Sequence, residues 1–285
     1  MRSPFRMRDR FNINNYSNLA QRIITAIIGA GIIILGSIYS PWAYFLIFGL
    51  ILAFSQMEFY KLSGLDGMLP LKSFGTFLGI LIFFLTFFIE IGHLDDKFYF
   101  LIFPLVSLVF FIKLYRKSDR KPFTGVAYTF LGIFYVAVPF SLLNVAAFAV
   151  DETFHYEIIV GSLLILWASD SGAYFAGTKF GKTKLFERVS PKKSWEGFLG
   201  GAATAYLVSY ILGRYFQALP DWHWLCIATI IIVAGTYGDL IESLFKRSIE
   251  IKDSGKSLPG HGGFMDRFDG LLLSAPFIAA FLKIF

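Results

Sequence analysis

Charge and cysteine are both scarce in this sequence. Charged residues make up 16% of the 285 positions and hydrophobic residues 56%, whereas a soluble domain carries about 25% charged residues. A soluble chain of this length could not bury so many apolar side chains in one or two cores. The single cysteine, Cys226, excludes an internal disulfide, and we interpret it as a small apolar residue of a membrane span. These shortages exclude an ordinary soluble protein and indicate lipid as the solvent.

Long apolar runs take the place of the missing charges. Lipid offers no hydrogen bonds, so each spanning segment must satisfy its own backbone, and continuous apolar runs favour helices over alternating strands. We therefore expect an all-α, polytopic integral membrane protein whose spans each need about 20 residues. Pro139 predicts a kink in the fifth span. The nine predicted spans are Ile23–Tyr39, Trp42–Tyr60, Phe74–Ile91, Phe98–Ile112, Phe123–Val150, Ile158–Ala176, Trp195–Leu212, Trp222–Phe245 and Leu271–Phe285.

The positions of Lys and Arg predict the orientation of these spans. With nine spans and a cytosolic N-terminus, only Lys97, Arg214 and Lys283 of the 26 cations fall outside the cytosol. This distribution follows the positive-inside rule. Splitting the fifth span would move the last two cationic loops outside, so we reject the alternative of ten spans.

Ionisable residues are distributed differently along the chain. The sequence predicts a polar cytosolic tail (1–22), N-terminal transmembrane helices (23–150) and a C-terminal transmembrane region in which we place the chemistry (151–285). Before residue 150, Glu58 and Glu90 lie near span ends, where an interfacial role is expected. After it, Asp170 and Asp239 lie inside spans. Acids within a membrane are costly and usually functional.

Asp239 begins a polar stripe at the end of the eighth span. With Glu242, Ser243 and Lys246 it has the i, i+3, i+4, i+7 spacing of one helix face. A solvated helix end would give the same stripe. Here, however, the stripe leads into a glycine-rich loop, which the solvated alternative does not explain.

The loop from 252 to 263 suits an anion. Gly260, Gly262 and Gly263 allow close backbone approach, and their N–H groups next to a helix start can bind phosphate. Asp266 and Asp269 follow on one helix face. Hard oxygen ligands beside a phosphate-binding loop predict Mg²⁺.

A cationic stretch lies between the two acidic spans. Residues 176–183 nearly match a P-loop, but they follow a span rather than a strand, so we set the ATPase interpretation aside. Lys182 and Lys184 suit phosphate binding and an ordinary cytosolic cluster equally well. Lys192 and Lys193 precede a predicted helix start, where anions bind readily, so we favour a function for them.

Three stretches resemble the phosphatidate cytidylyltransferase family. Residues 243–269 match its signature without a departure, and residues 170–174 and 189–197 are similar to the family as well. The match is strong from about 167 to 270, and the chain length is typical of the bacterial type.

The resemblance implies a reaction in which CTP and phosphatidate give CDP-diacylglycerol and pyrophosphate with Mg²⁺. A second metal ion is left open. The lipid phosphate is already ionised, so catalysis would depend on positioning and charge neutralisation rather than on a strong base. The expected location is a bacterial cytoplasmic membrane with the site facing the cytosol. The expected partners are the two substrates and the bilayer, with no nucleic acid and a homodimer left open.

The candidate residues fall into three groups by expected role. The catalytic candidates are Asp239, Asp266, Lys252 and Asp253. The phosphate-binding candidates are Lys192, Lys193, Ser194, Lys246, Arg247, His261, Gly262, Gly263 and Arg267, although Arg267 could instead form a structural pair with Asp266. The metal ligands are Asp239 and Asp266, with Asp170, Glu242 and Asp269 as lesser candidates.

Two other classes of protein compete with this interpretation. A transporter would carry charges near the midplane and show internal repeats, and no repeat is visible here. A different lipid phosphotransferase, acting for instance on a polyprenyl phosphate, would have a similar site. Measuring pyrophosphate release from CTP with either phosphatidate or a polyprenyl phosphate as the lipid distinguishes the two lipid enzymes.

Overall fold

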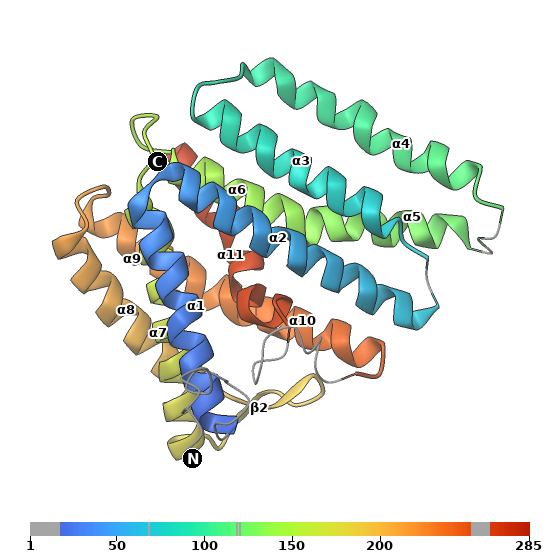
Figure 1. The fold of residues 1–285 in the computed structure, drawn as a ribbon. Coiled ribbons are helices and arrows are strands. Elements are labelled where there is room, and N and C mark those ends of the chain that lie inside the picture. Colours follow the sequence, from blue (N-terminus) through green and yellow to red (C-terminus); the bar gives the residue numbers. More distant parts are fainter. Residues whose placement is uncertain (1–17, 68, 118, 120, 252–262) are drawn as a thin grey trace, which may run out of the picture.

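The computed structural model describes every residue except 1–17, 68, 118, 120 and 252–262, and over these residues the chain is nearly all-α (Figure 1). Each predicted span coincides with a helix or a run of continuous helices, although three of the spans were predicted to end one to three residues beyond the helix. The single helices are α1 (Asn18–Tyr39), α2 (Pro41–Ser63), α3 (Lys72–Glu90), α7 (Tyr156–Phe180), α8 (Trp195–Tyr215) and α11 (Met265–Ile284). The composite ones are η4 (Asp96–Leu101) with α4 (Ile102–Leu114); α5 (Pro122–Gly132), η5 (Ile133–Ala137) and α6 (Val138–Ala147); and α9 (Asp221–Ile230), η6 (Ile231–Gly235) and α10 (Thr236–Ser248).

Two of the composite helices contain a π-helical turn, which the sequence patterns did not predict. In the fifth predicted span, η5 ends two residues before Pro139, and it contains Tyr135, four residues before the proline. A proline ring clashes with the carbonyl four residues earlier, and a widened turn accommodates it. The helix therefore continues through the expected kink. The second π turn, η6, comes just before the polar stripe of α10.

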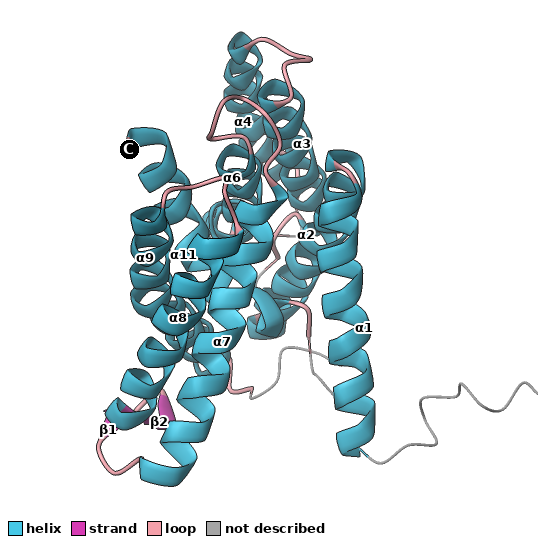
Figure 2. Ribbon diagram, turned by 90° about the vertical axis from the view of Figure 1, so that its left-hand side faces the viewer, coloured by secondary structure: helices cyan, strands magenta, loops and turns pink. Residues whose placement is uncertain are grey.

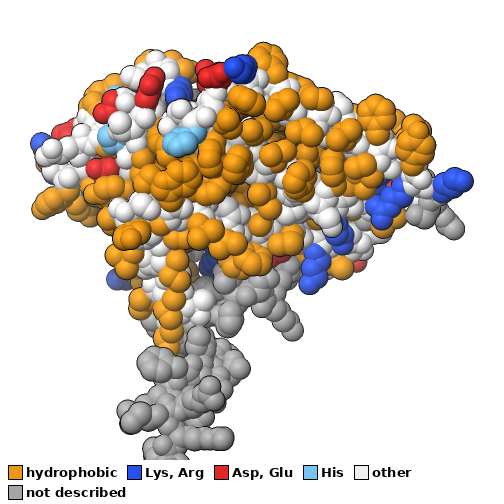
Figure 3. Space-filling view, turned by 45° about the horizontal axis from the view of Figure 1, so that its top comes forward, with side chains coloured by type: hydrophobic (Ala, Val, Ile, Leu, Met, Phe, Trp, Pro, Cys, Tyr) orange, Lys and Arg blue, Asp and Glu red, His pale blue; other side chains and the backbone are white. Residues whose placement is uncertain are grey.

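Membrane-spanning character is clearest in six of these helices. They have the length and hydropathy to cross a bilayer, and they cover 41–63, 72–90, 96–114, 122–147, 156–180 and 221–248. Helix α1 contributes a shorter apolar stretch, Ile24–Tyr39. Figure 3 shows a broad face covered by hydrophobic side chains, with Lys and Arg gathered toward its margins. The fold is thus that of an α-helical membrane protein.

The N-terminal helices pack through aromatic rings. Between α2 and α3, Phe45 and Phe87 lie 4.5 Å apart between ring centroids, and Phe45 stacks on Phe83 at 5.6 Å. Asn144 of α6 accepts a 3.0 Å hydrogen bond from the Tyr44 hydroxyl. Offset ring pairs add stability beyond the buried area, so these helices form a densely packed unit.

Helices α7 and α8 pack through small residues. A Cβ at Gly172 would collide with Thr204, and one at Gly200 would collide with Ala176. Only glycine permits backbones to approach this closely. Helix α7 of this close pair carries Asp170, and the hairpin that links α7 to α8 carries Lys193.

A two-stranded hairpin joins these two helices, β1 (Lys184–Phe186) to β2 (Ser190–Ser194). It occupies the predicted cationic loop, for which no strands were expected. The P-loop-like stretch ends α7 rather than following a strand, in agreement with setting the ATPase interpretation aside. Figure 2 shows the hairpin at the same end of the bundle as the start of α1, with the C-terminus at the other end.

Candidate active site

The carboxylates of α10 and α11 meet where these two helices are closest. A Cβ at Gly238 would collide with the carbonyl oxygen of Asp269, so glycine allows the two backbones to touch. Oxygens of Asp239, Glu242 and Asp269 consequently lie within 4.8 Å of one another. Three hard carboxylate donors at this spacing fit a divalent cation such as Mg²⁺. We call these three residues the acidic cluster.

Two lysines neutralise the acidic cluster from opposite sides. Lys193 Nζ lies 2.7 Å from Asp239 Oδ2. Lys246 Nζ lies 2.9 Å from Glu242 Oε2 and 3.1 Å from Asp266 Oδ1. Asp266 is therefore joined to the acidic cluster through Lys246. The arrangement holds acids and cations together at one place, as binding of a metal and a polyphosphate requires.

The hairpin fixes Lys193 at the start of α8. The Ser194 hydroxyl accepts a 3.1 Å hydrogen bond from the Gly197 N–H and so caps the helix. Glu196 accepts hydrogen bonds from the N–H groups of Lys182 and Thr183 at 3.1 Å. These bonds close the loop onto the helix. They hold the hairpin in the position from which Lys193, the residue before the cap, contacts Asp239.

Asp170 faces the same site from α7. Its side chain is exposed, and it interacts electrostatically with Asp239, Lys193 and Arg267. Asp170 thus stands beside the acidic cluster without being part of its closest group. The predicted candidates on four separate elements, α7, β2, α10 and α11, converge on one site.

Residues 20–285 match the model of a family described as the cytidylyltransferase family. The chain belongs to this family. It is 30% identical to the phosphatidate cytidylyltransferase of Haemophilus influenzae, in an alignment that covers 92% of this chain and 98% of that protein. The enzyme of the same name from Bacillus subtilis is 39% identical over 156 residues, 50% of this chain and 58% of that protein. The enzyme of the same name from Staphylococcus saprophyticus is 36% identical over 177 residues, which are 61% of this chain and 66% of that protein.

The remaining candidates of this cytidylyltransferase are three exposed cations, a glycine that precedes α11 and four residues outside the described ones. Lys192, Arg247 and Arg267 are exposed, and Arg247 donates to the carbonyl of Ile251 at 3.0 Å. The Gly263 N–H donates to Asp266 Oδ2 at 3.3 Å, so the predicted anion-binding glycine contacts an acid of its own helix start. Lys252, Asp253, His261 and Gly262 lie outside the described residues.

Sequence reasoning missed the role of Glu58. It was expected at the membrane interface, but it is buried and accepts a 3.0 Å hydrogen bond from the N–H of Phe264 at the start of α11. One turn earlier on α2, Phe54 stacks on Phe264 with 5.2 Å between ring centroids. A carboxylate at a helix N-terminus stabilises that helix. The N-terminal half of the cytidylyltransferase therefore positions the helix that carries Asp266 and Asp269.

Tyr135 was missed as well. It belongs to the π turn η5, and the carboxylates of Glu242, Asp269 and Asp239 all act on it electrostatically. Its hydroxyl is buried and has no hydrogen-bond partner among the described residues. A buried, unsatisfied hydroxyl is costly in a native structure and calls for an explanation. No sequence signal distinguished it, because the same phenylalanine-rich span holds a second tyrosine, Tyr128.

Proposed function

We propose that this chain transfers a cytidylyl group from CTP to phosphatidate, giving CDP-diacylglycerol and pyrophosphate for phospholipid synthesis. The observation that carries the proposal is the acidic cluster flanked by Lys193 and Lys246, in a member of the cytidylyltransferase family. Relatives named phosphatidate cytidylyltransferase support the choice of lipid. A nucleotidyltransferase needs such a site because it must bring two polyanions together.

Mg²⁺ is the proposed cofactor, with a second ion left open. Asp239, Glu242 and Asp269 would hold it, since their oxygens already converge. When bound, the ion would neutralise nucleotide phosphates and stabilise the departing pyrophosphate. Asp266, first expected as a ligand, would instead support the site by orienting Lys246. Asp170 would take a supporting place on the opposite helix.

The cations of the site would bind the phosphates. Lys193 and Lys246 are held by acids of the site at 2.7–3.1 Å, so their ammonium groups are positioned before substrate arrives. The phosphate of phosphatidate is ionised at neutral pH, and the site needs no strong base to activate it. Charge neutralisation and alignment would then supply most of the rate.

The proposed topology has nine spans, with the N-terminus and the active site in the cytosol of a bacterium. Its support is the position of the hairpin at the same end of the bundle as the start of α1 (Figure 2). The acidic cluster is tied to that hairpin by Lys193. A water-soluble nucleotide and a membrane lipid could meet at this end of the bundle. The location proposed is the cytoplasmic membrane.

The direct test measures pyrophosphate released from CTP by the purified protein in detergent. We expect release only with both phosphatidate and Mg²⁺, together with CDP-diacylglycerol in equal amount. Equal or greater turnover with a polyprenyl phosphate would replace phosphatidate as the substrate. No release with any phospholipid or polyprenyl phosphate would overturn the cytidylyltransferase proposal and return the transporter to consideration.

A variant of Lys193 tests the phosphate-binding role. Lys193→Ala should lower kcat/KM for CTP about tenfold or more, because a charge-assisted contact is lost. Lys117→Ala is the matched control, since Lys117 is an exposed cation of the loop between α4 and α5. Equal values for the two variants would return Lys193 to the ordinary cationic cluster of that membrane face.

A further inference from the structure

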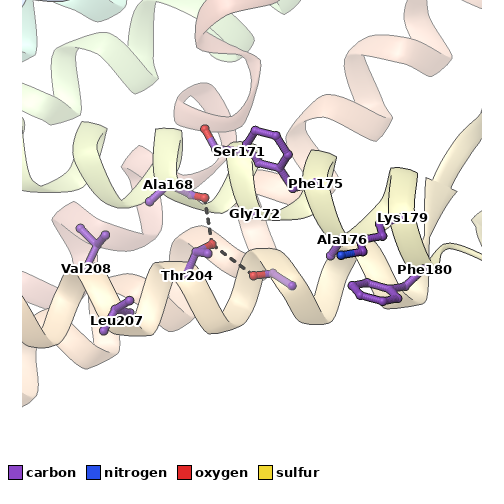
Figure 4. A pocket seen from close by; sticks show the side chains of 11 residues that line it. Ala168, Ser171, Gly172, Phe175, Ala176, Lys179, Phe180, Thr204, Leu207 and Val208 are labelled. Carbon is purple, nitrogen blue, oxygen red and sulfur yellow. Dashed lines mark hydrogen bonds between the residues drawn. The ribbon is translucent and has the colours of Figure 1, made fainter.

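A groove with a volume of about 510 Å³ lies between α7 and α8, away from the acidic cluster (Figure 4). Its lining includes Lys179, which follows Asp170 by nine residues. Nine residues are two and a half helical turns, so the two side chains point to opposite sides of α7. The groove is therefore separate from the site that Asp170 faces. Its volume falls within the usual range for ligand pockets.

The walls and floor of the groove are apolar. Gly172, Gly200 and Thr204 line it where α7 and α8 touch, which we call its floor. The larger side chains of Phe175 and Leu207 line it as well. The Thr204 hydroxyl donates to the Ala168 carbonyl at 2.9 Å, which leaves the floor without a free hydroxyl proton. A surface of this kind suits a hydrocarbon chain rather than a polar ligand.

The length of the groove matches one leaflet of a membrane. From Ala168 to Lys179 the lining extends over eleven residues of α7, or about 16 Å along the helix axis. The hydrocarbon core of a bilayer is about 30 Å thick, so this is about half of it. In the proposed topology, with the hairpin at the membrane surface, a groove of this length would extend from that surface to about the middle of the membrane.

A cation lies at the hairpin end of the groove. The ammonium group of Lys179 lies 5.4 Å from the centre of the Phe180 ring, and both residues line the groove. Lysines near a membrane surface attract anionic lipids. The apolar channel below and the charge above together match the shape of one phospholipid, with its acyl chain along the floor and its phosphate beside the ammonium group.

We propose that the α7–α8 groove binds one acyl chain of an anionic bilayer phospholipid from the leaflet on the hairpin side, with its phosphate at Lys179. The lipid is a bound component and not the substrate, because the groove faces away from Asp170. It would brace α7, which carries Asp170, against α8, which begins directly after the hairpin strand that carries Lys193. This inference does not require the proposed reaction.

The test uses photo-crosslinking of the whole protein in lipid nanodiscs. The probe is phosphatidylglycerol with a diazirine midway along one acyl chain. Phosphatidylcholine and phosphatidate with the same chain are the comparison probes. Labelled peptides are mapped by mass spectrometry. We expect phosphatidylglycerol to label the groove-lining parts of α7 and α8, about fivefold more than phosphatidylcholine does, the effect of one cation at a membrane surface.

Two variants with matched controls complete the test. Leu207→Trp fills the groove and should lower labelling by all three lipids several-fold. Leu225→Trp, at another exposed leucine on α9, should not. Lys179→Gln should bring phosphatidylglycerol and phosphatidylcholine to parity, and Lys117→Gln should leave the difference intact. Leu207 and Lys179 are both exposed, so these changes should leave the fold intact.

Three results would overturn the proposal. Labelling spread evenly over all lipid-facing helices would reduce the groove to ordinary lipid contact. Labelling by phosphatidate alone would assign the groove to the substrate. Equal labelling of Leu207→Trp and Leu225→Trp would show that the groove does not hold the chain. None of these results depends on turnover, so the proposed reaction and this inference can fail separately.

Discussion

The two halves of the chain use different means to bring their helices together. In α1–α6, stacked rings such as Phe45 with Phe83 fill the space between helices. In α7–α11, glycines such as Gly172 and Gly238 remove that space and let backbones touch. Large rings give a dense scaffold, whereas close backbones place short side chains such as aspartate within reach of one another. The difference explains why the acidic cluster lies in the second half.

Ionisable residues follow the same division. In the first half Lys113 pairs with Asp119, and Glu90 of α3 pairs with Lys283 of α11 in the second half at 3.2 Å; each is a single ion pair. In the second half, carboxylates of α10 and α11 converge and share lysines. Single pairs hold elements in place, and a converging set can bind a third partner. The comparison predicts that substitutions in the converging set lower turnover, whereas substitutions in the single ion pairs leave turnover almost unchanged.

The largest effect is expected at Asp239. Asp239→Asn should lower kcat by more than about a hundredfold, the upper range for residues that only support a metal ligand. The protein should remain folded, because the substitution removes a charge within the membrane. Pyrophosphate release measured against Mg²⁺ concentration should show partial recovery at high Mg²⁺. The control is Glu90→Gln, which should change turnover less than twofold. Similar losses in both variants would remove the contrast between the halves.

Glu58 lies in the first half but binds the start of α11 in the second, so its substitution should give the next largest loss of turnover. Glu58→Ala removes the acceptor for the Phe264 N–H, so α11 loses its cap at a cost of about 1 kcal/mol and Asp269 shifts. We expect turnover to fall about tenfold, together with weaker activation by Mg²⁺ in the same titration. Glu58→Gln keeps an acceptor oxygen and should lie between Glu58→Ala and the unmodified protein. A loss of thermal stability in Glu58→Ala with unchanged Mg²⁺ activation would make Glu58 purely structural.

A smaller loss of turnover is expected at Tyr135, and it should come without a loss of stability. Tyr135→Phe removes only a hydroxyl that is buried without a partner among the described residues. Removing such a group should not reduce stability. If the hydroxyl contacts a bound phosphate or metal-bound water, kcat should fall about three- to tenfold while the thermal unfolding temperature stays level or rises. Unchanged kcat would place Tyr135 outside the reaction. The neighbouring exposed Phe134→Leu is the control.

The smallest effect on turnover is expected at Asp119. Lys113 lowers the pKa of this carboxyl through a direct hydrogen bond, and both side chains are nearly inaccessible. A lowered pKa means that the pair stabilises the fold above the unfolded value of about 3.9. This stability is lost as the pH falls through the lower folded value. Asp119→Asn should reduce the unfolding temperature by about 5 °C at pH 7, and the difference should shrink below about pH 4. The kcat of the folded fraction should stay unchanged; a drop in kcat would contradict the division.

Much of the fold could be predicted because lipid imposes a simple pattern. Continuous apolar runs predicted all nine helical segments that the structure describes. The hairpin could not be predicted, since its short strands depend on Glu196 binding the N–H groups of Lys182 and Thr183. The π turns were also missed, because hydropathy does not distinguish a widened turn from a regular one.

The candidate site could be predicted in its residue types but not in its grouping. Spacing along α11 placed Asp266 and Asp269 on one face, and it did not say which of them meets Asp239. That choice depends on Gly238, where the backbones touch next to Asp269. The role of Glu58 was missed because its partner, Phe264, is 206 residues away in the sequence. Contacts between distant segments carry no local signal.

The contact between Glu58 and Phe264 has a consequence for how the protein is made. The ribosome adds about 5–20 residues per second, so the 206 residues between the two partners take about 10–40 seconds to translate. During that interval α2 is already in the membrane with a carboxylate that has yet to meet the start of α11. A nascent chain halted before Phe264 would lack both this contact and Asp269, so the acidic cluster could not yet form. The site is therefore completed only when almost the whole chain has been translated.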